Sequence, residues 1–174
     1  MKAFTTFLAI SLLSASALVA GPAAVKVEPP YAAPDIEGVD QEGKTVKFAE
    51  LYKSSPYVVV YFYPKADTPG CTKQGCSLRD GHAELTKKGV KVVGVSADTV
   101  AAQKSFSDKF TFPFTLIADK EGKVIDAFKV VKKGNGMASR EAFIIKDGKV
   151  IWHDPQASTD KQSEDVLKVL EDLK

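Results

Sequence analysis

Cysteine, histidine and arginine are scarce in this sequence, and each scarcity excludes a class of protein. Among 174 residues there are two cysteines and two histidines, and Arg79 and Arg140 are the only arginines among 24 basic residues. Two thiols without close histidine or carboxylate partners are too few for a zinc or iron–sulfur site. Lysines spread along the chain, with so little arginine, argue against a nucleic-acid-binding surface, which would show a basic cluster.

Apolar runs long enough to span a membrane are also missing, and this absence decides how the amino-terminal segment is interpreted. It begins with a basic residue at Lys2, continues through an apolar stretch at 7–13 and ends in small residues at Ala20. This is the anatomy of a secretory signal peptide, whereas a transmembrane span would need ~20 mostly apolar residues. We therefore expect a signal peptide over 1–20, cleaved near Ala20 or at Ala17, and an exported protein, with a bacterial periplasm as the expected compartment. No cysteine follows the cleavage region, so we expect no lipid on cysteine and no stable membrane anchor.

The remainder has the composition of one globular domain, with 44% apolar and 26% charged residues over the whole chain. The Pro- and Ala-rich segment 21–33 predicts a linker with little structure of its own. The folded domain is then expected to span 34–174.

Strand and helix patterns alternate along this domain. The run YVVVYFY at 57–63 is apolar or aromatic throughout and predicts a strand that is buried on both faces. Further strands are predicted at 90–96, 114–119, 141–146 and 149–154, helices at 71–88, 101–110, 122–128 and 160–173, and an opening hairpin with its turn at 40–44 and a strand at 46–51. The alternation implies a parallel central region, and the Asp147-Gly148 turn adds antiparallel strands. We therefore predict an α/β, thioredoxin-like fold, with a mixed central sheet flanked by helices on both faces.

Both cysteines lie in the segment YPKADTPGCTKQGC, directly after the first buried strand. Thr68 is a good N-cap, and Pro69 suits the first helical position because its missing N–H is not needed there. Cys71 then takes the third helical position, where its sulfur can face unpaired N–H groups and the positive end of the helix dipole. That environment favours the reactive thiolate. Gly70 leaves room for another group to approach the backbone closely.

The spacing of the two cysteines leaves three interpretations: a structural disulfide, a metal site and a redox switch. If Cys71 and Cys76 share one regular helix, their Cα atoms are ~8–9 Å apart, beyond the ~7 Å limit for a disulfide. A bridge then requires the helix to unwind, and Gly75, a poor helix former, lowers the cost of unwinding. A permanently bridged loop stays open as an alternative, because an exported protein meets oxidising conditions. His82 would lie ~16 Å from Cys71 on one helix, too far to complete a metal site or act as a base, and His153 has no partner that the sequence identifies.

A thiolate at a helix start, with a second thiol that reaches it only after movement, suits peroxide chemistry. The thiolate attacks one oxygen of an O–O bond and becomes a sulfenic acid, while the departing oxygen needs hydrogen-bond donors. The Thr68 hydroxyl and the Cys71 backbone N–H are local donors. A cation is also needed to stabilise the negative charge on the departing oxygen. The second thiol then condenses with the sulfenic acid to a disulfide.

The segment YFYPKADTPGCTKQGCSLRD resembles the active site of peroxiredoxins of the bacterioferritin-comigratory, or Q-type, branch. Pro64-x-x-x-Thr68-x-x-Cys71 matches the pattern of that family, and the resemblance runs from about residue 34 to residue 173. It implies that Cys71 is the peroxidatic and Cys76 the resolving cysteine, that Thr68 orients the peroxide, and that Pro64 shields the thiolate from water.

The same resemblance supplies the cation. Ser139-Arg-Glu-Ala-Phe143 is similar to the context of the catalytic arginine in the family, which implies that role for Arg140. Arg79, in contrast, is interpreted as a residue of the helix surface. The family commonly has threonine where Ala142 stands, a departure expected to alter only local strand packing.

The resemblance implies a thiol peroxidase that reduces hydrogen peroxide and organic hydroperoxides through a Cys71–Cys76 disulfide. A thioredoxin-like or glutaredoxin-like donor would recycle it, and no cofactor, metal or nucleic acid is expected; the branch is often monomeric. Two alternatives remain. An exported thiol–disulfide oxidoreductase acting on protein disulfides would usually show Cys-x-x-Cys, which is absent, and a binding module would hold a structural disulfide.

Overall fold

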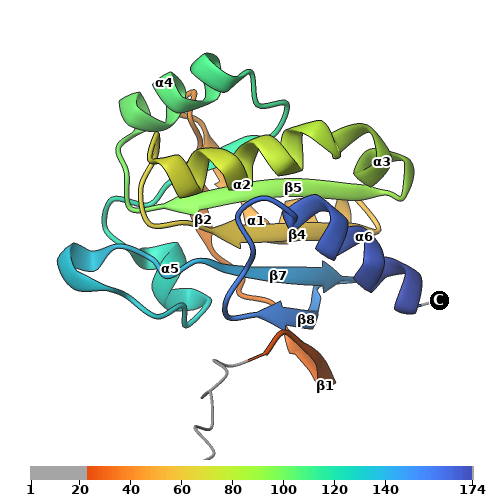
Figure 1. The fold of residues 1–174 in the computed structure, drawn as a ribbon. Helices are drawn as coiled ribbons and strands as arrows, with labels where there is room; N and C mark the ends of the chain where they lie inside the picture. Colours follow the sequence, from red (N-terminus) through yellow and green to blue (C-terminus); the bar gives the residue numbers. More distant parts are fainter. Residues whose placement is uncertain (1–22, 174) are drawn as a thin grey trace, which may run out of the picture.

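The computed structural model describes residues 23–173, so the signal peptide expected over 1–20 lies outside the described part. A six-stranded mixed sheet forms the centre of the molecule (Figure 1), in the order β1-β8-β7-β4-β5-β6. Its strands are β1 (Val25–Ala32), β4 (Tyr57–Phe62), β5 (Val90–Ser96), β6 (Thr115–Ala118), β7 (Glu141–Lys146) and β8 (Lys149–Asp154). The strands β4, β5 and β6 are parallel, whereas β7, β8 and β1 add antiparallel pairs. The mixed sheet agrees with the predicted fold class.

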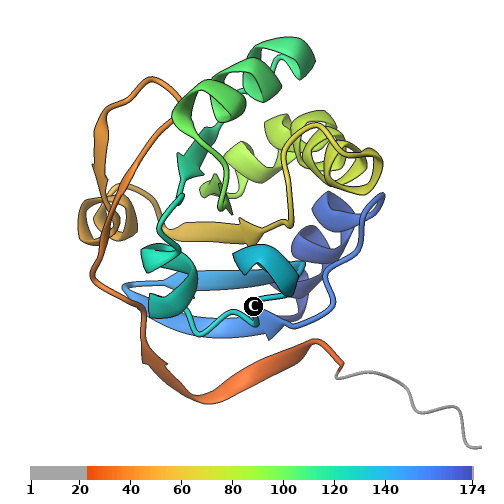
Figure 2. The ribbon, with the colours of Figure 1, turned by 90° about the vertical axis from the view of Figure 1, so that its left-hand side faces the viewer.

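Helices cover both faces of this sheet, as Figure 2 shows from the side. On one face lie α2 (Pro69–Asp80), α3 (His82–Lys87), α4 (Val100–Phe110) and α6 (Gln162–Asp172), and on the other lie α1 (Phe48–Lys53) and α5 (Lys123–Ala127). Alternate residues of β4 supply the two cores, with Val59 and Tyr61 facing the first set of helices and Val60 and Phe62 the second. The apolar run that predicts this strand is therefore buried on both sides, as parallel strands under helices require.

The prediction that 21–33 form a linker with little structure is wrong for Val25–Ala32, which form strand β1 along the edge of β8. Its two prolines, Pro29 and Pro30, conceal the strand pattern in the sequence, but proline is tolerated on an edge strand. The pairing shifts register between Lys26 and Tyr31, on either side of these prolines. The edge of β8, which would otherwise be open to another chain, is covered in this way.

Two further predicted elements differ in detail. The helix predicted at 71–88 is broken at Gly81 into α2 and α3, where a Cβ on this glycine would lie 2.5 Å from the Ser163 Cβ of α6. The opening hairpin exists as β2 (Glu37–Val39) and β3 (Thr45–Lys47), but the strand predicted to Leu51 gives way to α1 after Lys47. A short 3-10 turn, η1 (Gly134–Gly136), precedes β7. The long connection 129–139 leads into β7, the strand that pairs antiparallel with β4.

Candidate active site

The predicted helix start is present at the carboxyl end of β4. Thr68 is the extended N-cap of α2, Pro69 is its first residue and Cys71 its third, with the Cys71 side chain 2% exposed. The Thr68 hydroxyl does not cap the helix but donates to the carbonyl oxygen of Lys65 at 3.0 Å. The Thr68 side chain therefore leaves the first-turn N–H groups of α2 uncapped.

The loop between β4 and α2 is fixed by a carboxylate from the segment that follows the neighbouring strand β5. One oxygen of Asp98 accepts from the Ala66 N–H at 2.7 Å and from the Ser96 hydroxyl at 2.7 Å. Asp67, in the left-handed region with φ of 56°, forms an ion pair with Lys109 at 2.8 Å. These contacts hold the loop that carries Pro64 and Thr68 in one conformation. Pro64 itself is partly exposed and immediately follows the buried Tyr63.

Arg140, the residue directly before β7, brings a positive charge to Cys71 from a distant part of the sequence. Its Nη2 donates to the Cys71 sulfur at 3.4 Å, and its Nη1 donates to Gln74 Oε1 at 2.5 Å. The sheet explains this meeting, because β7 pairs antiparallel with β4 and places Glu141 opposite Phe62. A Cβ on Gly70 would lie 3.1 Å from Arg140 Nη2, so this glycine makes room for the guanidinium. The close approach predicted at Gly70 is therefore made by Arg140.

Two buried glutamines complete the surroundings of Arg140, and neither was among the site residues predicted from the sequence. Gln74 and Gln162 both have no exposed surface, and Gln74 Nε2 donates to Gln162 Oε1 at 2.8 Å. Gln74 lies three residues after Cys71, hence on the same face of α2. That spacing is the one signal that could have identified it. Gln162 is the first residue of α6, where glutamine is an ordinary surface residue by pattern alone.

Cys76 is not brought together with Cys71. Both thiols are free and both belong to the continuous helix α2, with Cys76 only partly buried. Five residues of regular helix keep the Cα atoms ~8–9 Å apart, outside the ~7 Å range of a disulfide. Gly75, expected to loosen the helix, has a packing role here, because a Cβ would lie 2.5 Å from Phe112 Cζ.

The two tyrosines of the β4 region line the core below the cysteines. Tyr61 and Tyr63 stack with ring centroids 5.4 Å apart, and both are fully buried. The Tyr63 hydroxyl donates to Gln103 Oε1 at 2.5 Å, whereas the Tyr61 hydroxyl has no hydrogen-bond partner among the described residues. Burial raises the pKa of both hydroxyls far above the usual value, so both stay neutral.

The other residues considered from the sequence lie outside this cluster. The His82 ring packs near Phe114, with centroids 6.2 Å apart, and belongs to α3 rather than to the helix of Cys71. His153, for which the sequence identified no partner, shares a hydrogen bond with the buried Glu141 at 2.8 Å and stacks on Phe143. Arg79, expected on the helix surface, is half-buried and donates to the Phe110 carbonyl at 2.9 Å. It therefore ties α2 to the end of α4.

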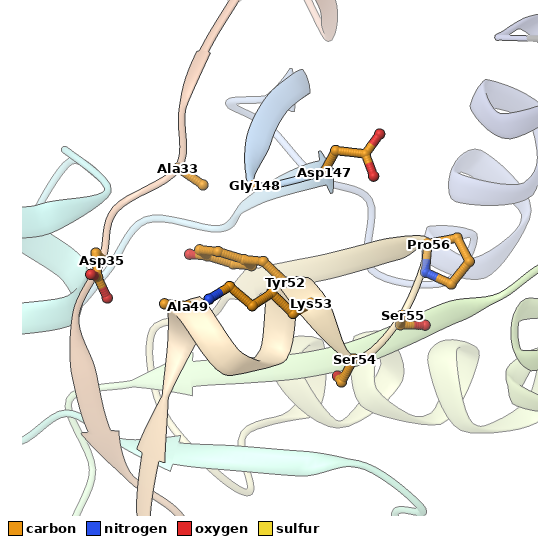
Figure 3. A pocket seen from close by; sticks show the side chains of 10 residues that line it. All are labelled: Ala33, Asp35, Ala49, Tyr52, Lys53, Ser54, Ser55, Pro56, Asp147 and Gly148. Carbon is orange, nitrogen blue, oxygen red and sulfur yellow. The ribbon is translucent and has the colours of Figure 1, made fainter.

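A separate hollow of about 680 Å³ lies at the opposite end of β4, away from the cysteines (Figure 3). It is bounded by the chain entering the domain, by α1 and by the β7–β8 turn, with Tyr52, Asp35 and Asp147 among its lining residues. The Tyr52 hydroxyl donates to the Pro34 carbonyl at 2.9 Å and so is already occupied. Nothing in this hollow approaches Cys71 or Arg140.

Within residues 23–173 no three side chains of His, Cys, Asp or Glu gather as metal ligands would. Over the same residues, no helix has the length and hydropathy that crossing a bilayer requires.

In this fold, a buried cysteine at a helix start contacts a guanidinium at the carboxyl end of a central strand. This arrangement is typical of the class of thiol-based redox enzymes. The AhpC/TSA family model matches residues 30–153. Peroxiredoxin Q, chloroplastic, of Sedum lineare is 40% identical over 138 residues, which cover 78% of this chain and 73% of that protein. Peroxiredoxin bcp1 of Schizosaccharomyces pombe is 37% identical over 134 residues, covering 74% of this chain and 68% of that protein.

Solved structures agree with these relatives. Peroxidoxin BcpB from Mycobacterium tuberculosis matches with a TM-score of 0.76 at 31% identity, covering 83% of this chain and 97% of that one. Xanthomonas campestris peroxiredoxin Q matches with a TM-score of 0.73 at 28% identity, covering 80% and 92% respectively. The chain belongs to the AhpC/TSA family and, within it, to the Q-type branch of the peroxiredoxins. Peroxiredoxins are thiol peroxidases, so this protein is an oxidoreductase that acts on a peroxide.

Proposed function

We propose that the protein reduces hydrogen peroxide and organic hydroperoxides at Cys71 and closes each cycle through a Cys71–Cys76 disulfide. The observation that carries the proposal is the contact of 3.4 Å between Arg140 Nη2 and the Cys71 sulfur, inside a buried helix start. A guanidinium in this place stabilises negative charge on sulfur and, in the transition state, on the departing oxygen.

The first step makes a sulfenic acid. The Cys71 thiolate attacks one peroxide oxygen, an S–O bond forms, the O–O bond breaks, and the other oxygen leaves as water or alcohol after taking a proton. Sulfur is oxidised by two electrons and the peroxide is reduced by two. The Thr68 hydroxyl, now bonded to the Lys65 carbonyl, and the first-turn N–H groups are the local donors proposed to orient the peroxide, with Pro64 shielding the sulfur.

The second step requires α2 to unwind, because the helix holds the two sulfurs apart. The Cys76 thiol then attacks the Cys71 sulfenic sulfur, an S–S bond forms and water leaves. A thioredoxin-like or glutaredoxin-like dithiol returns both cysteines to thiols by two successive exchanges. We propose further that the protein is exported and monomeric, so that its donor is a dithiol protein of the exported compartment.

The test is stopped-flow oxidation of the reduced protein by peroxide, with Cys71→Ser and Cys76→Ser variants beside the wild type. Wild type should consume peroxide far faster than free cysteine does and turn over with a dithiol donor. Cys71→Ser should abolish consumption, and Cys76→Ser should consume one equivalent and then stop. Wild-type rates in Cys71→Ser would rule out the assignment, and multiple turnovers with a dithiol donor in Cys76→Ser would rule out the disulfide.

A further inference from the structure

A chain of buried hydrogen bonds leads from the peroxidatic sulfur to the C-terminal helix. Arg140 contacts the Cys71 sulfur and donates to Gln74 Oε1, and Gln74 Nε2 donates to Gln162 Oε1 at 2.8 Å. Gln162 has no exposed surface, and its own Nε2 has no hydrogen-bond partner among the described residues. A buried amide group whose N–H has no acceptor lowers stability, which points to a role that Gln162 plays in the site.

The direction of this chain is set by the chemistry of arginine. A guanidinium has only donors, so Gln74 must turn its oxygen toward Arg140 and its amino group toward α6. Gln162 must then turn its oxygen toward that amino group, which leaves its Nε2 at the end of the chain without an acceptor. A flipped Gln74 would place its amino group against the guanidinium and its oxygen against the oxygen of Gln162, so both neighbours oppose the flip.

We propose that Gln162 is a positioning residue for Arg140, so that the first turn of α6 belongs to the peroxidatic site. The proposal rests on the proposed peroxidase function and deepens it. Gln74 lies between the two cysteines, and unwinding of α2 must break its bond to Gln162. Gln162 therefore supports the peroxide step, through Arg140, and opposes the disulfide step, through α2.

Ser163, the next residue of α6, provides a matched control. Its hydroxyl lies 3.2 Å from the Ser77 hydroxyl, and its N–H donates to the same oxygen at 3.2 Å. It thus fastens α6 to α2 beyond Cys76 without a hydrogen bond to Gln74 or Arg140. A loss of general packing between the two helices should affect Ser163→Ala and a Gln162 variant alike, whereas a loss of Arg140 positioning should affect only the latter.

The experiment measures Cys71 oxidation by peroxide in the Cys76→Ser background, where only the first step occurs. Gln162→Leu should slow this step about tenfold, as loss of a hydrogen bond that orients a charged group predicts, while Ser163→Ala should stay within about twofold. Gln162→Glu, which keeps the acceptor and has no N–H to leave unpaired, should recover most of the rate. Gln162→Met serves in place of Gln162→Leu if circular dichroism shows the latter unfolded.

In chains that retain Cys76, Gln162→Leu should form the Cys71–Cys76 disulfide at least as fast as wild type once the sulfenic acid exists. Alkylation of Cys71 by iodoacetamide reports the Arg140 contact without peroxide, and it should be slower in Gln162→Leu. If the wild-type protein did not react with peroxide, the peroxidase function would be refuted. The comparison of alkylation rates would still decide the role of Gln162. Equal alkylation and oxidation rates in wild type and Gln162→Leu, or equal slowing by Ser163→Ala, would overturn the proposal.

Discussion

Tyr61 and Tyr63 show how the same residue type has opposite energetic effects two positions apart. Their rings stack in the core, but the Tyr63 hydroxyl is satisfied by Gln103, which in turn donates to Ser96 and to the Ile117 carbonyl. The Tyr61 hydroxyl has no partner among the described residues. An unsatisfied buried hydroxyl costs free energy that an apolar ring of the same shape does not.

We therefore predict that Tyr61→Phe raises the free energy of unfolding by about 1 kcal/mol, since it removes an unpaired polar group. Tyr63→Phe should lower it by about 1–3 kcal/mol, because Gln103 Oε1 loses its donor. Urea denaturation of the reduced protein, followed by circular dichroism, measures both. Destabilisation by both variants to the same extent would contradict the assignment of Tyr61 as unsatisfied.

Asp154 gives a prediction on pH. Burial, and then the nearby charge of Asp165, raise the pKa of its carboxyl, although the Gln156 N–H donates to it at 2.9 Å. A raised pKa in the folded state means that the group favours folding when protonated, at low pH, and that this contribution is lost as the pH rises through the folded pKa.

Asp154→Asn should consequently stabilise the protein at pH 7, where the wild-type carboxylate is charged, and the gain should shrink at pH 3. The asparagine keeps an oxygen to accept from Gln156. Parallel urea titrations of the two proteins at the two pH values test this, and a gain that grows toward acid pH would be the opposite of the expected sign.

At the scale of elements, Gly75 of α2 packs closely against Phe112, so helix propensity alone would predict the wrong effect for a substitution of this glycine. Alanine is favoured over glycine in a helix interior by about 1 kcal/mol, so propensity predicts that Gly75→Ala stabilises α2. A Cβ added at this position would lie 2.5 Å from Phe112 Cζ, and Phe112 stacks on Phe114. The aromatic layer cannot retreat without disturbing its own packing.

Gly75→Ala should therefore lower the free energy of unfolding by about 1–3 kcal/mol, the usual cost of overpacking. Gly134→Ala is the control, because a Cβ there meets nothing within 4 Å; it should change stability by less than about 0.5 kcal/mol. Thermal and urea unfolding under reducing conditions compare the two. A stabilised Gly75→Ala would show that propensity outweighs this contact.

The elements also show what sequence reasoning can and cannot reach. The strand at Tyr57–Phe62 and the helix start at Thr68 are dictated by neighbouring residues, so local patterns predict them. Arg140 meets Cys71 across 69 positions of sequence, and only the resemblance to a family located it. Gln162 had no local signal at all, because a glutamine at the start of an amphipathic helix is ordinarily solvated.

At the scale of the whole molecule, β1 closes one edge of the sheet. It pairs with β8, and the Ala33 N–H donates to the Gly148 carbonyl at 2.9 Å just beyond it. The sequence concealed this strand because its prolines and alanines resemble a linker. None of the residues of the candidate active site belongs to β1, so the effect of β1 on stability can be measured separately from its effect on the proposed reaction.

A chain that begins at Ala33 should lose about 2 kcal/mol or more of unfolding free energy, since the β1–β8 hydrogen bonds are removed, and should associate through the bare edge of β8. A chain that begins at Ala24 and keeps β1 is the control. Size-exclusion chromatography and urea unfolding report the two effects. Cys71 oxidation should stay near the wild-type rate in folded monomer, and a large loss would mean that β1 acts on the site.

The position of Gln74 between the two cysteines has a kinetic consequence for the proposed cycle. Arg140 contacts Cys71 while α2 is helical, whereas the proposed disulfide requires α2 to unwind, so one chain cannot be in both states at once. Peroxide and reducing protein then never compete for the same conformation. Turnover should follow a ping-pong scheme without a ternary complex, and an excess of either substrate should not block the other.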